Sequence, residues 1–374
     1  MRVHILYHNY LTADGSKMSI GGIQTYISEL APVFRDLGYA VSIYQGAEVE
    51  FRKEVNDCEV VGCICTNPRK KRQVLLNKCM EHFDADSDIL LWATETLTTK
   101  VPGNIKSIAI QHGVSWDKPE QCGSKFKSFL RCCMKAVDAI RTIRHTALAS
   151  KLICVDYNYV NWYRSLVAEQ EVSLEVIPNF SVIAPKRGNA QSEDGPVKII
   201  FARRFFPYRG TRIFGNAMKR MLDANYPVEV TVAGEGPDEQ WLRDMLGGYP
   251  NVQFIKYGSE ESLAVHGDKD IAVVPTTGSE GTSLSLLEAM SAQCAVICTN
   301  VGGMTNIILD HYNGLMINPD EEALYRAMLT LIEDRQLRRK LADKGYETVR
   351  EGFSREIWRE RWKGIIQELS STNL

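Results

Sequence analysis

The fold of this chain is decided by residues 271–298, which read IAVVPTTGSEGTSLSLLEAMSAQCAVIC. The apolar run Ile271–Pro275 is typical of a buried strand, and the run Cys294–Cys298 predicts a second one. The residues between them read as a polar turn followed by a helix that begins near Thr282 or Ser283. A strand, a turn, a helix and another strand form a βαβ unit, which predicts a parallel sheet covered by helices.

Two carboxylates, Glu280 and Glu288, flank the expected start of this helix. In such sheets ligands bind at the carboxyl ends of the strands, which is where Glu280 is expected to lie. The free N–H groups and the positive dipole end of the helix favour an anion such as a phosphate. The carboxylates can accept hydrogen bonds from sugar or ribose hydroxyls beside it, so the pattern predicts a nucleotide-sugar site. The alternative is that these glutamates only stabilise the helix dipole.

The length and composition of the chain limit the number of domains and the class of protein. The chain has 374 residues, which exceeds the usual size of one domain and predicts two domains of roughly 150–200 residues. It is 44% hydrophobic and 24% charged with a formal net charge of −2, so it reads as an ordinary globular protein and nothing points to nucleic acid. No apolar run approaches the length of a membrane span, and Met1–Tyr7 reads as a strand without a cleavage site. We therefore expect a cytoplasmic protein.

The ten cysteines raise the question of disulfides or zinc. No Cys-x2-Cys pair occurs, and Cys154, Cys294 and Cys298 lie inside apolar strand-like runs, where cysteine acts as a small hydrophobic residue. We predict reduced, structural thiols and no metal site.

Strand-like and helix-like runs alternate along the chain, which predicts parallel α/β domains. Residues 181–196 are rich in glycine, proline and charged residues and predict an exposed linker. We expect one domain at 1–180, a second at 197–352, and an aromatic-rich amphipathic helix at 353–374. The predicted strands are Val3–Tyr7, Ala40–Tyr44, Ile89–Ala93, Ser107–Gln111, Leu152–Val155, Glu175–Ile177, Lys198–Ala202, Val228–Ala233, Val252–Ile255, Ile271–Val274, Ala295–Cys298 and Leu315–Ile317.

The sequence resembles the retaining glycosyltransferases of family 4 over nearly its whole length. The resemblance is carried by the Glu-x7-Glu pair of Glu280 and Glu288, by Val301-Gly-Gly303 and by Asn313-Gly-Leu315. That family has the GT-B architecture, in which two Rossmann-like domains with parallel sheets face each other across a cleft. The resemblance implies that the first domain binds the acceptor, that the second binds the nucleotide sugar, and that the last helix crosses back to the first domain.

The resemblance also implies roles around the predicted helix start. Glu280 would orient the donor sugar, and Glu288 would bind the ribose. The donor site would further include Gly281, Thr282, Ser283 and Leu284. The chain departs from the family in two places, because Thr282-Ser283 stands where an aromatic-Gly pair is usual, and Asn306 stands where the Gly-Gly element usually ends in glutamate. These changes bear mainly on which sugar is bound, and the alternative is that they weaken catalysis.

A basic turn follows the first strand of the second domain, in Ala202-Arg-Arg-Phe-Phe-Pro-Tyr-Arg-Gly210. Arginine can grip phosphate oxygens bidentately, so the turn predicts a diphosphate site. It resembles the family's Gly-Arg-x4-Lys-Gly element, with Arg204 at the arginine and Arg209 at the lysine. Arg203 replaces the glycine of that element, so a second register with Arg203 in the site remains open, as does a solvated turn.

Two glycine-rich turns are also candidates for the donor site. Gly21-Gly22 opens a helix after the first strand and resembles a glycine-rich loop that lies against the phosphates or the acceptor in the family. The alternative for Gly22 is a simple turn. Gly234-Glu-Gly236-Pro lacks the third glycine of a dinucleotide fingerprint and resembles a family turn that lines the donor pocket.

One histidine stands out by its position. His112 follows the predicted strand Ser107–Gln111, so it is expected at the carboxyl end of a strand in the first domain. The family has a histidine at this location that contacts the donor sugar near the reacting carbon. We therefore predict that His112 acts with Glu280 in catalysis, and the alternative is a structural histidine.

A basic amphipathic segment follows His112 in the chain. Between Gln121 and Lys151 there are seven basic residues and one acidic residue, Asp138, and apolar residues recur at helical spacing. A second basic run, Arg69–Arg72, lies earlier in the same domain. A basic helix at 125–144 can lie on an anionic membrane. The alternative is a helix packed on the sheet with a solvated basic rim.

Together these observations predict a transferase that moves a sugar from a nucleotide sugar, such as a UDP- or GDP-sugar, to a hydroxyl of a glycan or glycolipid. The resemblance implies retention at the anomeric carbon, no metal ion or other cofactor, and a role in bacterial surface polysaccharide synthesis. The expected location is the cytoplasm, with peripheral contact to the inner face of the membrane. Two alternatives are a GT-B sugar-nucleotide epimerase and a non-catalytic nucleotide-binding GT-B protein.

Overall fold

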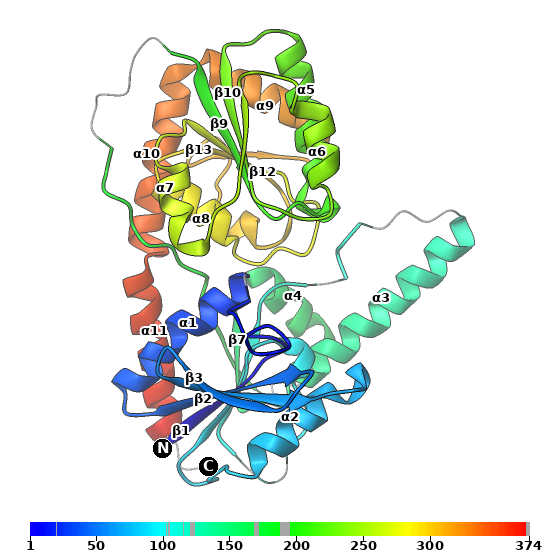
Figure 1. Cartoon of the computed structure of the whole chain (residues 1–374), viewed down its shortest axis with the longest axis vertical. Helices are drawn as coiled ribbons and strands as arrows, with labels where there is room; N and C mark the ends of the chain where they lie inside the picture. Colours follow the sequence, from blue (N-terminus) through cyan, green and yellow to red (C-terminus); the bar gives the residue numbers. More distant parts are fainter. Residues whose placement is uncertain are drawn as a thin grey trace. The chain divides into compact units, whose positions relative to one another are not determined.

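The computed structural model describes residues 1–19, 21–101, 103, 105–114, 116–119, 124–167, 172–187 and 195–371. The chain forms two compact units (Figure 1). Unit 1 comprises Met1–His112, Cys122–Pro178 and Trp358–Leu374, and unit 2 comprises Gly113–Gln121 and Asn179–Ile357. Of the predicted linker at 181–196, residues 188–194 lie outside the described residues.

The sheet of unit 1 has the strand order β3-β4-β2-β1-β5-β6-β7-β8 within the described chain. Neighbouring strands are parallel except β3 and β4, which form an antiparallel hairpin at one edge. The central strand β5 reads Ile-Leu-Leu-Trp and is buried throughout, as expected when both faces of a parallel sheet are covered. The strands are β1 Arg2–Leu6, β2 Ala40–Ala47, β3 Phe51–Val55, β4 Cys58–Ile64, β5 Ile89–Trp92, β6 Ser107–Gln111, β7 Lys151–Cys154 and β8 Ser173–Val176.

The end of the chain completes the core of unit 1. In helix α11, Trp358 and Trp362 are buried and lie edge-on to the ring of Tyr26, whose hydroxyl accepts a hydrogen bond from Trp362 Nε1 at 2.9 Å. Arg359 of the same helix pairs with Glu29 at 2.7 Å. The helices are α1 Gly22–Asp36, α2 Lys71–Met80, α3 Lys125–Thr146, α4 Tyr157–Leu166 and α11 Arg355–Ser371.

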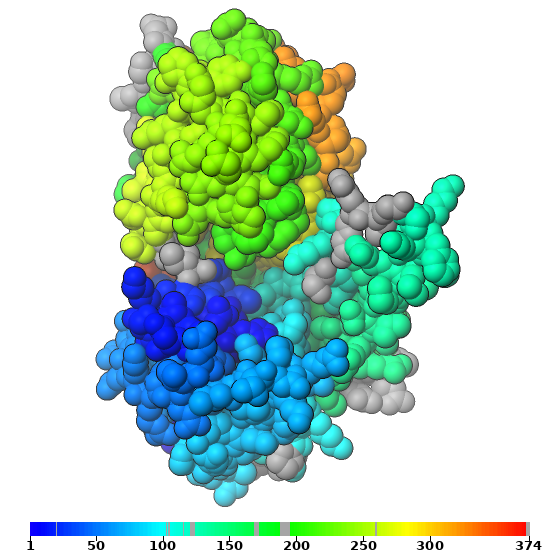
Figure 2. Space-filling model, turned by 45° about the vertical axis from the view of Figure 1, so that its right-hand side comes forward, coloured from blue at the N-terminus to red at the C-terminus, as the bar shows by residue number. Residues whose placement is uncertain are grey.

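The first half of α3 does not pack on the sheet of unit 1. It extends from its unit as a single helix, as Figures 1 and 2 show. Phe126, Phe129 and Val137 expose 74%, 68% and 63% of their surface. Buried side chains of this helix occur near its end, at Ala139, Ile143 and Thr146. The alternative of a helix packed along its length on the sheet is therefore wrong for residues 125–138.

Unit 2 contains a parallel sheet with the strand order β11-β10-β9-β12-β13-β14 in its described part. Apolar side chains on one face of this sheet pack against α5, α6 and α9, and those on the other face pack against α8, while α10 contributes side chains to both clusters. The strands are β9 Val197–Ala202, β10 Val228–Ala233, β11 Val252–Ile255, β12 Ile271–Val274, β13 Ala295–Thr299 and β14 Leu315–Ile317. The helices are α5 Thr211–Asp223, α6 Glu239–Leu246, α7 Ser262–His266, α8 Leu284–Ser291, α9 Glu321–Glu333 and α10 Arg335–Gly352.

The predicted fold class, α/β with two parallel sheets, is confirmed. Each predicted strand of unit 2 forms within one residue of its expected bounds, whereas hairpin β3–β4 lies outside the predicted strands. The nine described cysteines are free thiols, and six of them are buried. Among the described helices, none is long and apolar enough to cross a membrane.

Candidate functional site

The strand order of unit 2 creates a position for a ligand. Counted within the unit, the order is 3-2-1-4-5-6, so β9 pairs with β10 on one side and with β12 on the other. The loops after β9 and β12 turn to opposite faces of the sheet and leave a crevice at the carboxyl ends of these two strands. The first loop carries Arg203 and Arg209, and the second carries Glu280.

Glu280 is held by two arginines. Its Oε2 accepts hydrogen bonds from Arg203 Nη2 at 2.6 Å, from Arg209 Nη1, and from Thr276 Oγ1 at 3.0 Å. Arg203 is 7% and Glu280 is 8% exposed, so the cluster is shielded from water. Burial by itself would raise the pKa of Glu280, but the charges of Arg203 and Arg209 outweigh it and lower the pKa to about 2. Glu280 is therefore ionised at neutral pH.

The cluster carries an excess of positive charge, because two guanidinium groups face one carboxylate. Arg203 Nη1 is buried and has no hydrogen-bond partner among the described residues. Leaving such a donor unpaired costs about 1–3 kcal/mol. A phosphate would satisfy it, since the planar guanidinium donates two parallel hydrogen bonds to phosphate oxygens. The geometry thus suits an anionic ligand at the crevice.

Glycines allow the Glu280 loop and the arginine turn to approach their neighbours. Gly302 has a φ of +56°, and a Cβ there would lie 2.0 Å from the Glu280 carbonyl oxygen. The N–H of Gly303 donates to that same oxygen at 3.1 Å. Gly234, with a φ of +139°, would place a Cβ 2.0 Å from the carbonyl oxygen of Arg203. A side chain at Gly302 or Gly234 would displace Glu280 or Arg203, so these glycines support the site through the backbone.

The structure brings Arg203, and not Arg204, to Glu280. Arg204 is exposed, and its guanidinium carbon lies 5.6 Å from the centroid of the Phe206 ring. The contact with Glu280 is thus made by Arg203, the residue that the second register of the sequence analysis would place in the site. Arg209 ends the short 3-10 turn Pro207–Arg209, and its guanidinium also bonds to Glu280.

Helix α8 begins at Leu284, with Ser283 as its N-cap, close to the predicted start. Ser283 makes no side-chain cap hydrogen bond, so the first turn of α8 keeps its positive end without a side-chain cap. Thr282 and Ser283 are buried. Glu288 lies one turn into the helix, where its Oε2 accepts a hydrogen bond from Ser262 Oγ at 2.6 Å. Burial raises the pKa of Glu288, and the hydrogen bond from Ser262 opposes that rise.

A segment far away in sequence supports the Glu280 loop within unit 2. The backbone N–H of Ser279 donates to Asp117 Oδ1 at 2.7 Å. A Cβ on Gly113 would lie 3.1 Å from the N atom of Gly281, and Lys118 Nζ lies 4.6 Å from the centroid of the Tyr208 ring. Sequence reasoning did not assign Asp117. Asp117 follows closely after a predicted strand, and this position was the sequence feature that could have suggested a role. The neighbouring residues do not indicate its partner, which lies more than 160 residues away in the sequence.

His112 and the start of α1 lie together in unit 1. The His112 ring is 4.8 Å from the ring of Tyr26, which follows Gly22 by about one turn of α1. Burial lowers the pKa of His112 to about 4, while a hydrogen bond to the Ala93 carbonyl opposes the shift. His112 Nε2 has no partner among the described residues, so Nδ1 is the atom that donates to the Ala93 carbonyl. In the neutral ring, Nε2 then carries no proton and can accept a hydrogen bond. The next residue, Gly113, belongs to unit 2.

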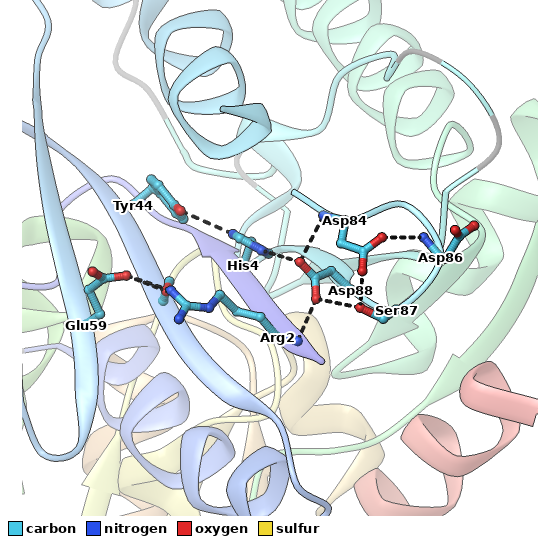
Figure 3. Close-up of polar contacts among 9 residues, drawn as sticks. Arg2, His4, Tyr44, Glu59, Asp84, Asp86, Ser87 and Asp88 are labelled. Atoms are coloured by element: carbon cyan, nitrogen blue, oxygen red, sulfur yellow. Dashed lines mark hydrogen bonds and ion pairs between the residues drawn. The ribbon is translucent and has the colours of Figure 1, made fainter. Parts of the chain in front are cut away.

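Two aspartate runs have a spacing that can suit a divalent cation, Asp84-Ala-Asp86-Ser-Asp88 and Asp268-Lys-Asp270. Asp88 bonds to the buried ring of His4 at 3.0 Å and accepts the Arg2 N–H at 2.7 Å. Figure 3 draws both contacts. The other His4 nitrogen lies 3.2 Å from the Tyr44 hydroxyl. This cluster ties strands β1, β2 and β5 together.

The second run is bound to β9. Asp268 pairs with Lys198 at 3.1 Å, and Asp270 accepts the Lys198 N–H at 2.8 Å. Among the side chains that the structure describes, no group of three or more His, Cys, Asp or Glu is arranged to hold a metal ion. Asp84, Asp88, Asp268 and Asp270 instead make hydrogen bonds or ion pairs within the protein.

Comparison with known proteins finds similarity to glycosyltransferases in both sequence and fold. Residues 183–348 match the family model of glycosyl transferases group 1. An uncharacterized glycosyltransferase of Methanocaldococcus jannaschii is 25% identical over 77% of this chain and 76% of its own length. Sucrose-phosphate synthase from Thermosynechococcus elongatus has the same fold, with a TM-score of 0.77 at 16% identity over 98% of both chains. HepE of Anabaena, in complex with UDP and glucose, aligns over 100% of both chains with a TM-score of 0.72 at 15% identity. Residues 183–348, which include Arg203, Arg209, Glu280 and Glu288, thus form a glycosyl transferases group 1 domain in a chain with the GT-B fold.

Proposed function

We propose that the protein is a retaining glycosyltransferase of family 4 that moves a sugar from a UDP- or GDP-sugar to a hydroxyl of a glycan or glycolipid, in bacterial surface polysaccharide synthesis. The group 1 domain supports a glycosyltransferase that uses a nucleotide-sugar donor. The observation that carries the proposal is the cluster of Arg203, Glu280 and Arg209 at the carboxyl ends of β9 and β12 in unit 2, where the strand order reverses. Unit 2 would bind the donor and unit 1 the acceptor.

The cluster suits the departure of a diphosphate. When the bond from the anomeric carbon to the diphosphate oxygen breaks, the electron pair stays on the diphosphate, and Arg203 and Arg209 stabilise its growing charge. The uncapped start of α8 adds N–H donors at the same end of the sheet. Glu280, freed from the arginines by the entering diphosphate, accepts hydrogen bonds from the sugar, and Glu288 accepts them from the ribose.

The proposed reaction needs neither a dedicated base nor a metal ion. The acceptor hydroxyl attacks the face of the sugar from which the diphosphate leaves, and the leaving phosphate takes the hydroxyl proton. Arg203 and Arg209 supply the positive charge that a cation would otherwise provide. His112, neutral and with Nε2 available, hydrogen-bonds the donor sugar near the reacting carbon, and the start of α1 at Gly22 contributes backbone N–H groups.

We also propose that the enzyme is cytoplasmic and meets the inner face of the membrane through α3. The first half of this helix exposes apolar side chains such as Phe126, Phe129 and Met134. Basic residues, including the exposed Lys125 and Lys127, lie on the same helix. Apolar side chains that enter the headgroup region, together with lysines that attract anionic lipids, are the two contributions that hold an amphipathic helix at a membrane.

Thermal shift with a panel of nucleotide sugars tests the donor part of the proposal. A bound donor at 100 times its Kd stabilises the protein by about 2.7 kcal/mol. The best donor is then incubated with the enzyme, with and without a glycan or lipid acceptor. Product that forms only with an acceptor supports a transferase, whereas a new sugar nucleotide formed without one would identify an epimerase. No stabilisation by any donor would contradict the proposal.

A further inference from the structure

Unit 1 contains a cavity that the donor site does not use. Its volume is about 320 Å³, and its lining includes His8, Arg69, Lys71, Arg72, Thr96 and Arg141. His8 follows β1 and Thr96 follows β5, and β1 lies between β2 and β5 in the sheet. The cavity therefore lies at the carboxyl ends of the strands at the switch point of unit 1, the position at which α/β sheets bind ligands.

The lining is strongly basic and has no carboxylate. It includes four cationic side chains, those of Arg69, Lys71, Arg72 and Arg141. None of the four forms an ion pair with a carboxylate in the part of the chain that the structure describes. Like charges gathered in a partly enclosed space repel one another, and a bound anion removes that cost.

The other groups of the cavity are arranged as neutral hydrogen-bonding partners. His8 Nε2 lies 2.8 Å from Thr96 Oγ1. Burial, together with the charge of Lys71, lowers the pKa of His8 to about 4, so this ring is neutral at pH 7. Arg72 Nη1 lies 3.2 Å from Nδ1 of His145, which must then be an acceptor. Burial and the charges of Arg72 and Arg141 lower the pKa of His145. The positive charge thus stays on the arginines and the lysine.

The backbone also makes room for these cations. Gly46 of β2 lies so close to Lys71 that a Cβ would be 2.9 Å from the lysine Cε. Lys71 and Arg72 form the first turn of α2, whose N-cap, Lys70, makes no side-chain cap hydrogen bond. The positive end of α2 therefore adds to the field of the side chains.

We propose that this cavity binds a phosphate or diphosphate group carried by the acceptor, an inference that rests on the proposed transferase function. Arginine forks grip phosphate oxygens bidentately, Lys71 adds a point charge, and Thr96 and His8 can hydrogen-bond the remaining oxygens. The volume falls at the lower end of the range for small-molecule sites, and exceeds the needs of a lone ion. Arg141 belongs to α3, so the same helix lines the cavity and exposes the apolar side chains of its first half.

Calorimetric titration of the full-length protein with inorganic pyrophosphate, in the presence of saturating UDP, tests the site. UDP affinity is measured first and reports on the donor site alone. We expect Arg69→Gln/Arg141→Gln to weaken pyrophosphate binding about tenfold or more and to leave UDP affinity unchanged, without lowering the melting temperature. The matched control is Lys100→Gln/Arg164→Gln, which removes two exposed positive charges of unit 1 outside the cavity.

Equal pyrophosphate affinity in the cavity variant and in the control would overturn the proposal, as would wild-type protein that does not bind pyrophosphate. Failure to bind any nucleotide diphosphate would instead contradict the proposed function. A second arm identifies the source of the phosphate, using phosphatidylcholine vesicles with and without phosphatidic acid. Stronger recruitment of the control than of the cavity variant to phosphatidic acid indicates a lipid-borne phosphate. Equal recruitment, with the pyrophosphate difference retained, indicates a soluble phosphorylated acceptor.

Discussion

At the scale of single residues, Glu280 is the carboxylate on which the donor site depends. Glu280→Gln removes the charge that pairs with two arginines, the buried Arg203 and the partly buried Arg209. We expect the variant to stay folded and its kcat to fall by about 100-fold or more, because a neutral amide cannot balance Arg203 and Arg209 or orient the sugar as a carboxylate does. Steady-state kinetics and circular dichroism check this.

The matched control for that variant is Glu229→Gln, which changes an exposed glutamate of β10. It should retain wild-type kinetics. Near-normal turnover of a folded Glu280→Gln enzyme would remove Glu280 from the catalytic machinery.

Alanine substitution of each of the three arginines tests which of them bind the diphosphate. Arg203→Ala and Arg209→Ala should weaken UDP binding by roughly tenfold or more while weakening uridine much less, because the guanidinium groups are proposed to grip phosphate. Arg204→Ala should cause a smaller loss of UDP affinity, since Arg204 is exposed and lies beside Phe206. Calorimetry with both ligands measures this, and a larger loss for Arg204 than for Arg203 would favour the register that places Arg204 in the site.

At the scale of elements, α3 carries a distinct prediction. The protein should sediment with anionic vesicles, and binding should fall at high salt because exposed charges are screened over about 8–10 Å. Lys125→Glu/Lys127→Glu should reduce binding through lost attraction, and Phe126→Ser/Phe129→Ser should reduce it through lost apolar burial. Equal binding to neutral vesicles, or none to either kind, would contradict a membrane role for α3.

Hairpin β3–β4 shows what local pattern alone can miss. Its turn, Asn56-Asp57, has φ values of 51° and 57°, a conformation that asparagine and aspartate tolerate better than other residues with side chains. The flanking run Phe51–Val55 is mostly exposed, so it lacks the apolar strand signal used elsewhere. The Asn-Asp pair was the feature of the sequence that could have indicated this hairpin. It indicates a hairpin turn only when both flanking segments are recognised as strands.

At the scale of the whole molecule, we expect buried histidines to make stability depend on pH. His266 is 2% exposed, and burial, together with Arg187 and Lys269, lowers its pKa to about 4 in the folded state. An unfolded histidine titrates near 6.5, so the unfolded state binds the proton more tightly and stability is lost as pH falls from about 6.5 to about 4. The shift of His266 corresponds to about 3 kcal/mol.

Burial also lowers the pKa of His8 and His112 to about 4, so these two histidines, like His266, reduce the stability of the fold as the pH falls. We expect the melting temperature to decline steadily between pH 7 and pH 5, and His266→Gln to make that decline shallower. His82→Gln, at an exposed position, is the control. A melting temperature that does not change over this range would contradict the prediction.

The sequence by itself determined the order of elements and the loops that carry the candidate donor site. Apolar runs such as Ile271–Val274 and the glutamate pair Glu280 and Glu288 are local signals, because a buried parallel strand must be apolar on both faces and its ligand loop must follow its carboxyl end. Tertiary structure alone decided which of two adjacent arginines meets Glu280. Adjacent side chains leave an extended backbone in opposite directions, and the pairing of this segment with β10, which continues to the Arg203 N–H and the Ala233 carbonyl, selects one of them. The support of Ser279 by Asp117, the cations gathered in unit 1 and the uncovered half of α3 also depend on long-range packing, which no local pattern encodes.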